Sequence, residues 1–170
     1  MQFKRLSSFV LLGAVCFSAA AHARSIVETQ QSTAYELPGG WTVLSWTEKT
    51  GEATLTNKTS GDLLKVERFG LAGTPTSYPN SEDLASGRTL TWEYTETTTG
   101  IGDSQLRGEV KFADAIVRIV VWDGSVPFTV IDQKAGLVAM RSIAASVKIL
   151  GPRKCWPAGE CPPGEVKEEK

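Results

Sequence analysis

The chain has 170 residues, with 18 lysines and arginines, 19 aspartates and glutamates, and a formal net charge of −1 at pH 7. A charge this small excludes the strongly basic surface with which proteins hold nucleic acid or an anionic membrane. The length is enough for one domain with a sizeable core and too short for two comfortable ones.

The N-terminal segment has the parts of a cleavable export signal. Lys4 and Arg5 precede an apolar run over residues 9–21, and residues 21–23 read Ala-His-Ala, the small-x-small pattern that a signal peptidase fits. The apolar run is shorter than the roughly 20 residues that span a bilayer, which weighs against a retained anchor. We therefore expect residues 1–23 to be removed and the mature protein to be periplasmic, with no membrane insertion after processing.

Two cysteines remain once the signal, which contains Cys16, is gone. Cys155 and Cys161 lie close together in the sequence, and such a pair in an oxidising compartment is expected to form a disulfide. We expect residues 152–170 to be a disulfide-pinned loop followed by a charged, disordered tail. At the other end, the polar residues 24–34 are expected to be a flexible lead-in.

Residues 35–151 are expected to form a single domain made mostly of antiparallel strands. The strand segments share an apolar–polar alternation or an enrichment in β-branched and aromatic residues, and turn residues such as Pro38-Gly39-Gly40 precede or separate them. The expected strands are residues 41–46, 52–57, 62–69, 90–95, 106–112 and 116–122. The Gly-, Pro- and Ser-rich residues 70–87 are expected to be a long loop.

The alternation also predicts which side chains face the core. Residues 116–122 are apolar on both faces apart from Arg118, which predicts a central strand. Trp41 and Trp46 have opposite parity, so a regular strand would bury one and leave the other free for contact. The other side chains expected to point inward are Ala53, Leu55, Leu64, Val66, Phe69, Leu90, Trp92 and Tyr94.

After residue 130 the apolar period becomes helical. Asp132 is a suitable N-cap and Gly151-Pro152 a suitable stop, so the sequence predicts one amphipathic helix between them. Its expected core positions are Leu137, Met140, Ile143, Ala144 and Val147. The predicted fold class is therefore α+β: an antiparallel β-sheet of meanders and hairpins with one C-terminal amphipathic helix packed on it.

The order of these elements and the helix sequence over residues 140–149 resemble the PsbP/Mog1-type α+β fold. The resemblance covers only the helix and the element order, so no functional residues are carried over from it. It suggests one function, an envelope protein that binds a small ligand, lipid or glycan between sheet and helix. An apolar cavity at that interface would favour this function, and a tightly filled core would disfavour it.

Several catalytic chemistries are missing from the mature chain. The only histidine is His22, inside the expected signal, which excludes Ser-His and Cys-His nucleophiles, histidine general bases and most zinc sites. No phosphate-binding glycine loop, dinucleotide fingerprint or calcium loop is present. We expect no catalytic residues, no metal and no cofactor. The remaining enzymatic alternative is a hydrolase that uses paired carboxylates such as Glu93 and Asp103 on peptidoglycan.

The segment between the strands at 90–95 and 106–112 is the strongest candidate for binding. Two glycines give it unusual backbone freedom, and Ile101 would be an apolar side chain at an exposed tip. The expected partner-binding residues are Thr99, Gly100, Ile101, Gly102, Asp103 and Ser104. The leading expectation is a non-catalytic immunity or inhibitor protein whose partner is another protein. It would occlude the active site of a cell-wall-degrading toxin, such as a peptidoglycan hydrolase delivered by type VI secretion.

Overall fold

The protein contains two antiparallel sheets and one long helix. The computed structural model describes residues 24–29, 33–47, 52–70, 76–96, 104–124, 130–151 and 164–169. The elements in chain order are β1 (Arg24–Glu28), β2 (Thr33–Glu36), β3 (Trp41–Trp46), β4 (Ala53–Asn57), β5 (Leu63–Gly70), β6 (Asn80–Asp83), β7 (Thr89–Thr95), β8 (Gln105–Lys111), β9 (Ala115–Trp122), α1 (Gln133–Ser146), β10 (Lys148–Ile149) and β11 (Glu165–Glu169). This arrangement confirms the predicted α+β class.

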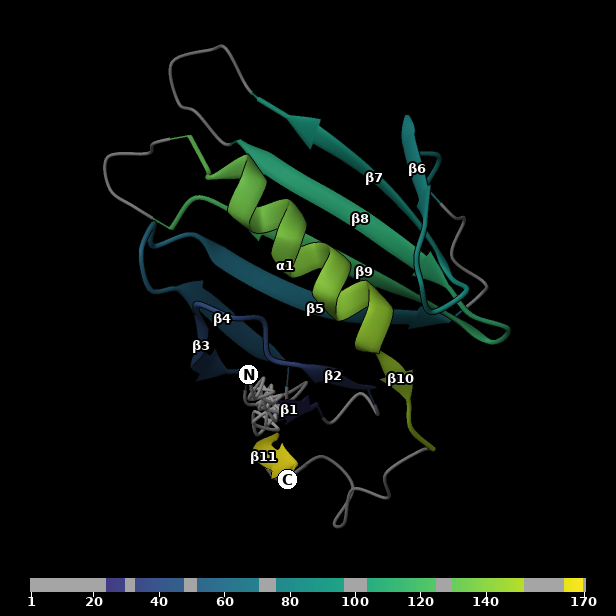
Figure 1. The fold of residues 1–170 in the computed structure, drawn as a ribbon, viewed down its shortest axis with the longest axis horizontal. Coiled ribbons are helices and arrows are strands. Elements are labelled where there is room, and N and C mark those ends of the chain that lie inside the picture. Colours follow the sequence, from purple (N-terminus) through teal and green to yellow (C-terminus); the bar gives the residue numbers. More distant parts are fainter. Residues whose placement is uncertain are drawn as a thin grey trace, which may run out of the picture.

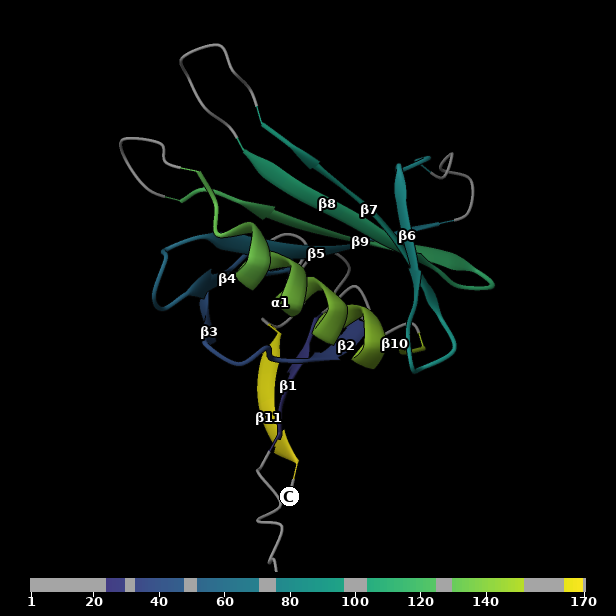
Figure 2. The ribbon, with the colours of Figure 1, turned by 45° about the horizontal axis from the view of Figure 1, so that its top comes forward.

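The elements form two layers (Figures 1 and 2). One layer is a seven-stranded sheet in the order β3-β4-β5-β9-β8-β7-β6, with β9 in the middle as predicted. The other layer consists of α1 and a small sheet in the order β10-β2-β1-β11. Both α1 and the small sheet lie on the same face of the large sheet. We call the opposite face, which no other described helix or strand covers, the open face.

Strand alternation builds the core between these layers. Leu64 pairs with Val121 and Leu106 pairs with the same Val121, so side chains of one parity from β5, β9 and β8 share the face under α1. Val27 and Tyr35 of the small sheet belong to the same buried cluster. The predicted inward positions Ala53, Leu55, Leu64, Val66 and Leu90 are all buried.

Phe69 was expected to point into the core, and this expectation is wrong. It pairs with Ile116 and its side chain is 38% exposed. Because Leu64 and Val66 point inward, an odd-numbered residue on the same regular strand must point outward. Phe69 therefore lies on the open face.

The helix packs closely against the large sheet. Asp132 caps its N-terminus as predicted, and the Asp132 side chain accepts a hydrogen bond from the Ala135 N–H at 2.9 Å. A Cβ atom placed on Gly108 of β8 would collide with the Met140 sulfur of α1. A Cβ atom placed on Gly136 of α1 would lie 3.4 Å from Leu106 of β8. Glycine at position 108 is thus required by the close approach of Met140. The interface where α1 crosses β8 is filled by protein atoms.

A β-bulge in β3 turns both of its tryptophans toward the core. The pairing of β3 with β4 shifts between Val43 and Ser45, which leaves Leu44 as an extra residue that is 59% exposed. The bulge resets the alternation, so Trp41 is buried in the core and Trp46 also packs against the core, partly buried. The expectation that one of the two would be free therefore fails, because it assumed a regular strand.

Three segments expected to be irregular contain strands. Residues 24–34, expected to be a flexible lead-in, include β1 and β2, and the C-terminal residues expected to be disordered include β11. These segments stabilise one another, because β1 pairs with β2 on one side and with β11 on the other. Within the predicted 70–87 loop, β6 pairs with β7 as an edge strand. Cys155 and Cys161 lie outside the described residues.

Candidate functional site

The predicted binding segment is described at only one of its positions. Residues 99–103 lie outside the described residues. Ser104 is 2% exposed, and its hydroxyl oxygen accepts a hydrogen bond from the Ile131 N–H at 2.9 Å. Ser104 thus anchors the segment that leads into α1, and we withdraw it as a direct contact with a partner. Thr95 pairs with Gln105, so the described parts of β7 and β8 end side by side at this end of the sheet.

The open face of the large sheet carries side chains of the parity opposite to the core. Glu67, Arg118 and Glu109 lie in one row across β5, β9 and β8, because Glu67 pairs with Arg118 and Arg118 with Glu109. Leu63, Trp122 and Gln105 form another row nearer the connection between β7 and β8. Polar and aromatic side chains therefore alternate with the apolar core residues along the same strands.

An ion pair between a buried glutamate and a partly exposed arginine lies at the centre of the open face. Glu109 is 5% exposed, and one of its carboxylate oxygens accepts a hydrogen bond from the Arg118 Nε at 2.8 Å. The other oxygen accepts one from the Thr76 N–H at 3.2 Å. The Arg118 guanidinium also lies 4.7 Å from the centre of the Phe69 ring. The Glu109 carboxylate, the Phe69 ring and the segment at Thr76 therefore hold the Arg118 side chain in place.

Residues 76–78 fold over this ion pair and form one wall of a hollow of about 340 Å³. Burial, and secondarily the nearby Glu109 carboxylate, raise the pKa of Tyr78 above its usual value. The phenol therefore stays protonated at neutral pH and keeps its ability to donate a hydrogen bond. The residues that line the hollow are Glu67, Thr76, Tyr78, Gln105, Arg107, Arg118 and Val120.

Trp122 is the partly buried tryptophan of the open face. It pairs with Gln105 on β8 and with Leu63 on β5, both of which are partly exposed. Trp92, in contrast, packs against the core. Tryptophan and arginine are enriched among the residues that dominate the energetics of protein interfaces, and Trp122 and Arg107 bring both types to this face, whereas Tyr78 is only 9% exposed. The sequence signals this face only weakly, through the single arginine inside the apolar run of β9.

Only one member of the carboxylate pair considered for hydrolysis lies among the described residues. Glu93 lies on the open face opposite Arg107 in the strand register, whereas Asp103 is outside the described residues. Among the residues that the structure does describe, no group of three metal-ligating side chains occurs. The same residues contain no helix with the length and apolar character of a membrane span.

Comparison with known proteins gives no family. No protein-family model and no curated protein matches this sequence.

Proposed function

We propose that the mature chain is a non-catalytic periplasmic binding protein that neutralises a cell-wall-degrading toxin by occluding its active site. The contact surface in this proposal is the open face around Arg107 and Trp122, together with residues 97–103 at the adjoining end of the sheet. The supporting observation is the contrast between the two faces of the large sheet. One face is sealed by α1 and the small sheet, and the other presents a polar hollow with aromatic and arginine side chains.

The packed crossing of α1 over the large sheet argues against the alternative in which a ligand lies between the helix and that sheet. Gly108 and Gly136 allow the helix and sheet to approach until side chains fill the space. A small ligand at that crossing would have to displace Met140 or Leu106, both of which are fully buried. Binding by surface contact needs no such rearrangement.

The test is protection of cells against a panel of periplasmic peptidoglycan amidases and muramidases. Cells that export the mature protein should survive one member of the panel, and the two proteins should co-elute as a one-to-one complex in size-exclusion chromatography. The double variant Trp122→Ala, Arg107→Glu should weaken that complex at least about tenfold. Ile101→Asp tests the adjoining segment, and Ser104 is left intact because a charge there would be buried.

Val138→Asp is the matched control. Val138 is 58% exposed on α1, on the other side of the large sheet, so this variant should bind and protect like the original chain. Equal loss in Val138→Asp and the open-face variant would contradict the proposed surface. Degradation of peptidoglycan by the mature protein alone would contradict the non-catalytic function, and replacement of Glu93 and Asp103 would then identify the acids responsible.

A further inference from the structure

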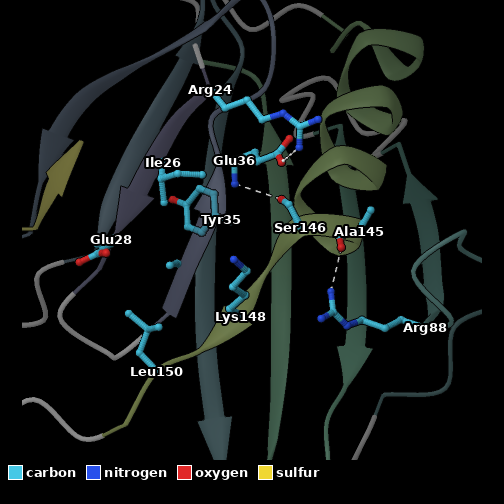
Figure 3. A pocket seen from close by; sticks show the side chains of 11 residues that line it. Arg24, Ile26, Glu28, Tyr35, Glu36, Arg88, Ala145, Ser146, Lys148 and Leu150 are labelled. Atoms are coloured by element: carbon cyan, nitrogen blue, oxygen red, sulfur yellow. Dashed lines mark hydrogen bonds and ion pairs between the residues drawn. The ribbon is translucent and has the colours of Figure 1, made fainter. Parts of the chain in front are cut away.

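A second hollow lies at the C-terminal end of α1, on the sealed side of the molecule. It has a volume of about 460 Å³ and is bounded by the small sheet and the last turn of the helix (Figure 3). This volume is within the range of small-molecule binding sites. The hollow differs in place from both the open face and the filled helix–sheet crossing.

The acids of this hollow already have cationic partners. The Glu36 carboxylate lies 2.7 Å from Arg24 NH1, and the Glu28 carboxylate lies 2.8 Å from the Lys167 Nζ. Lys148 projects toward the middle of the hollow (Figure 3). No hydrogen bond or ion pair joins its ammonium group to any part of the chain that the structure describes. The hollow therefore contains a positive charge that no carboxylate balances.

Arg88 supplies a second cation in a fixed orientation. Its NH1 donates hydrogen bonds to the carbonyl oxygens of Ala144 at 3.3 Å and Ala145 at 2.9 Å. Its guanidinium carbon lies 5.1 Å from the centre of the Phe112 ring. The end of a helix carries only about half a negative charge, so capping the helix leaves Arg88 with positive charge in excess. Its remaining N–H groups have no acceptor among the described residues.

Apolar side chains complete the hollow. Ile26 and Leu150 lie on the wall opposite Arg88 (Figure 3). We propose that this hollow binds a small organic anion, whose carboxylate or phosphate oxygens lie between Lys148 and Arg88 and whose short apolar part lies against Ile26 and Leu150. This site is independent of the proposed inhibitor function, because the open face is on the other side of the large sheet.

The test is an NMR titration of the ¹⁵N-labelled mature protein with sodium hexanoate and, separately, with hexyl phosphate. Saturable shifts of the Ala34, Ala145 and Lys148 amide signals are expected with at least one of them, and the tighter ligand identifies the preferred head group. Inorganic phosphate should bind more weakly because it lacks the apolar part. Hexylammonium chloride should not bind, because its charge has the wrong sign.

Charge variants then distinguish binding of the anion in this hollow from a general electrostatic attraction to the protein surface. Lys148→Gln should weaken hexanoate or hexyl phosphate binding about tenfold, the usual loss for one charge-assisted contact. Arg88→Lys should also weaken it, because lysine keeps the charge but loses the planar fork. Lys134→Gln, which removes the same charge from the exposed first turn of α1, should leave binding unchanged. Circular dichroism and melting temperature verify that each variant is folded.

Several results would overturn the proposal. These are the absence of saturation with both hexyl anions, equal binding of hexylammonium, or equal weakening by Lys134→Gln and Lys148→Gln. Equal affinity for inorganic phosphate would overturn the role of Ile26 and Leu150.

Discussion

Tyr35 is a large core residue whose hydroxyl group has no hydrogen-bond partner. It is 1% exposed, and its oxygen is the buried side-chain atom left unsatisfied among the described residues. An unsatisfied buried polar group costs roughly 1–3 kcal/mol, so Tyr35→Phe should leave the fold intact and raise its stability by about 1 kcal/mol. Chemical denaturation measures this, with Tyr94→Phe, a change near the surface, as the control. A clear loss of stability in Tyr35→Phe would contradict the unsatisfied hydroxyl.

The same residue makes stability sensitive to alkaline pH. Burial, with a smaller effect from Glu52, raises the pKa of Tyr35 far above its ordinary value. Above about pH 10 the unfolded chain releases this proton while the folded chain keeps it, so stability must fall as the pH rises. The loss should approach about 1.4 kcal/mol per pH unit from this residue. Tyr35→Phe should show a shallower decline of unfolding free energy between neutral and strongly alkaline pH, and an unchanged slope would contradict the assignment.

Arg118 is expected to be much more important for stability than its neighbour Arg107. Arg118→Ala would leave the Glu109 carboxylate buried without its cation, which costs about 3–5 kcal/mol in comparable cases. Arg107 is exposed and hydrogen-bonds only Gln105 among the described residues, so Arg107→Ala should change stability by less than about 0.5 kcal/mol. Urea denaturation of both variants makes the comparison. Similar small losses would show that Glu109 is reached by water.

The contact between α1 and β8 tests how closely the helix and the large sheet are packed. Gly108→Ala would place a methyl group against the Met140 sulfur, and we expect a loss of about 1–3 kcal/mol from overpacking. The loss should be smaller when Met140 is replaced by valine, since the two positions share the same space. A double-mutant cycle by thermal or urea unfolding measures this coupling. Additive effects would contradict direct contact.

Local patterns in the sequence predicted every strand of the large sheet except β6, because those strands either alternate or are rich in β-branched and aromatic residues. The bulge at Leu44 could not be predicted, since an extra residue breaks the parity on which the prediction depends. β1, β2 and β11 are short and polar, and they exist because the two ends of the chain pair with each other. Such non-local pairing leaves no periodic signal in either segment.

The candidate site was predictable only in part. Alternation places Arg118 and Trp122 on the face opposite Val117 and Val121, but it cannot say which face the helix covers. Nor does any local pattern indicate that Glu109 and Arg118 meet, since this depends on the register between β8 and β9. The buried role of Ser104 depends on Ile131, which only the folded chain brings near.

β11 is expected to stabilise the small sheet and its contact with β3. Gly164 packs so closely on the Trp46 ring that a Cβ atom there would collide with it. A chain ending at Pro163 should therefore lose roughly 5 °C of melting temperature. Lys167→Gln, which keeps β11 and removes a surface ion pair, is the control and should melt within about 1 °C of the original chain. An unchanged melting temperature after truncation would show that β11 is dispensable.

The pairing of β1 with β11 also sets the order of events during synthesis. Lys167 meets Glu28 across 139 positions of sequence, and ribosomes add about 5–20 residues per second. For about 7 to 28 seconds, β1 has therefore been made while its C-terminal neighbour has not. A nascent polypeptide therefore cannot close the small sheet until its last segment has been synthesised, which delays completion of the fold.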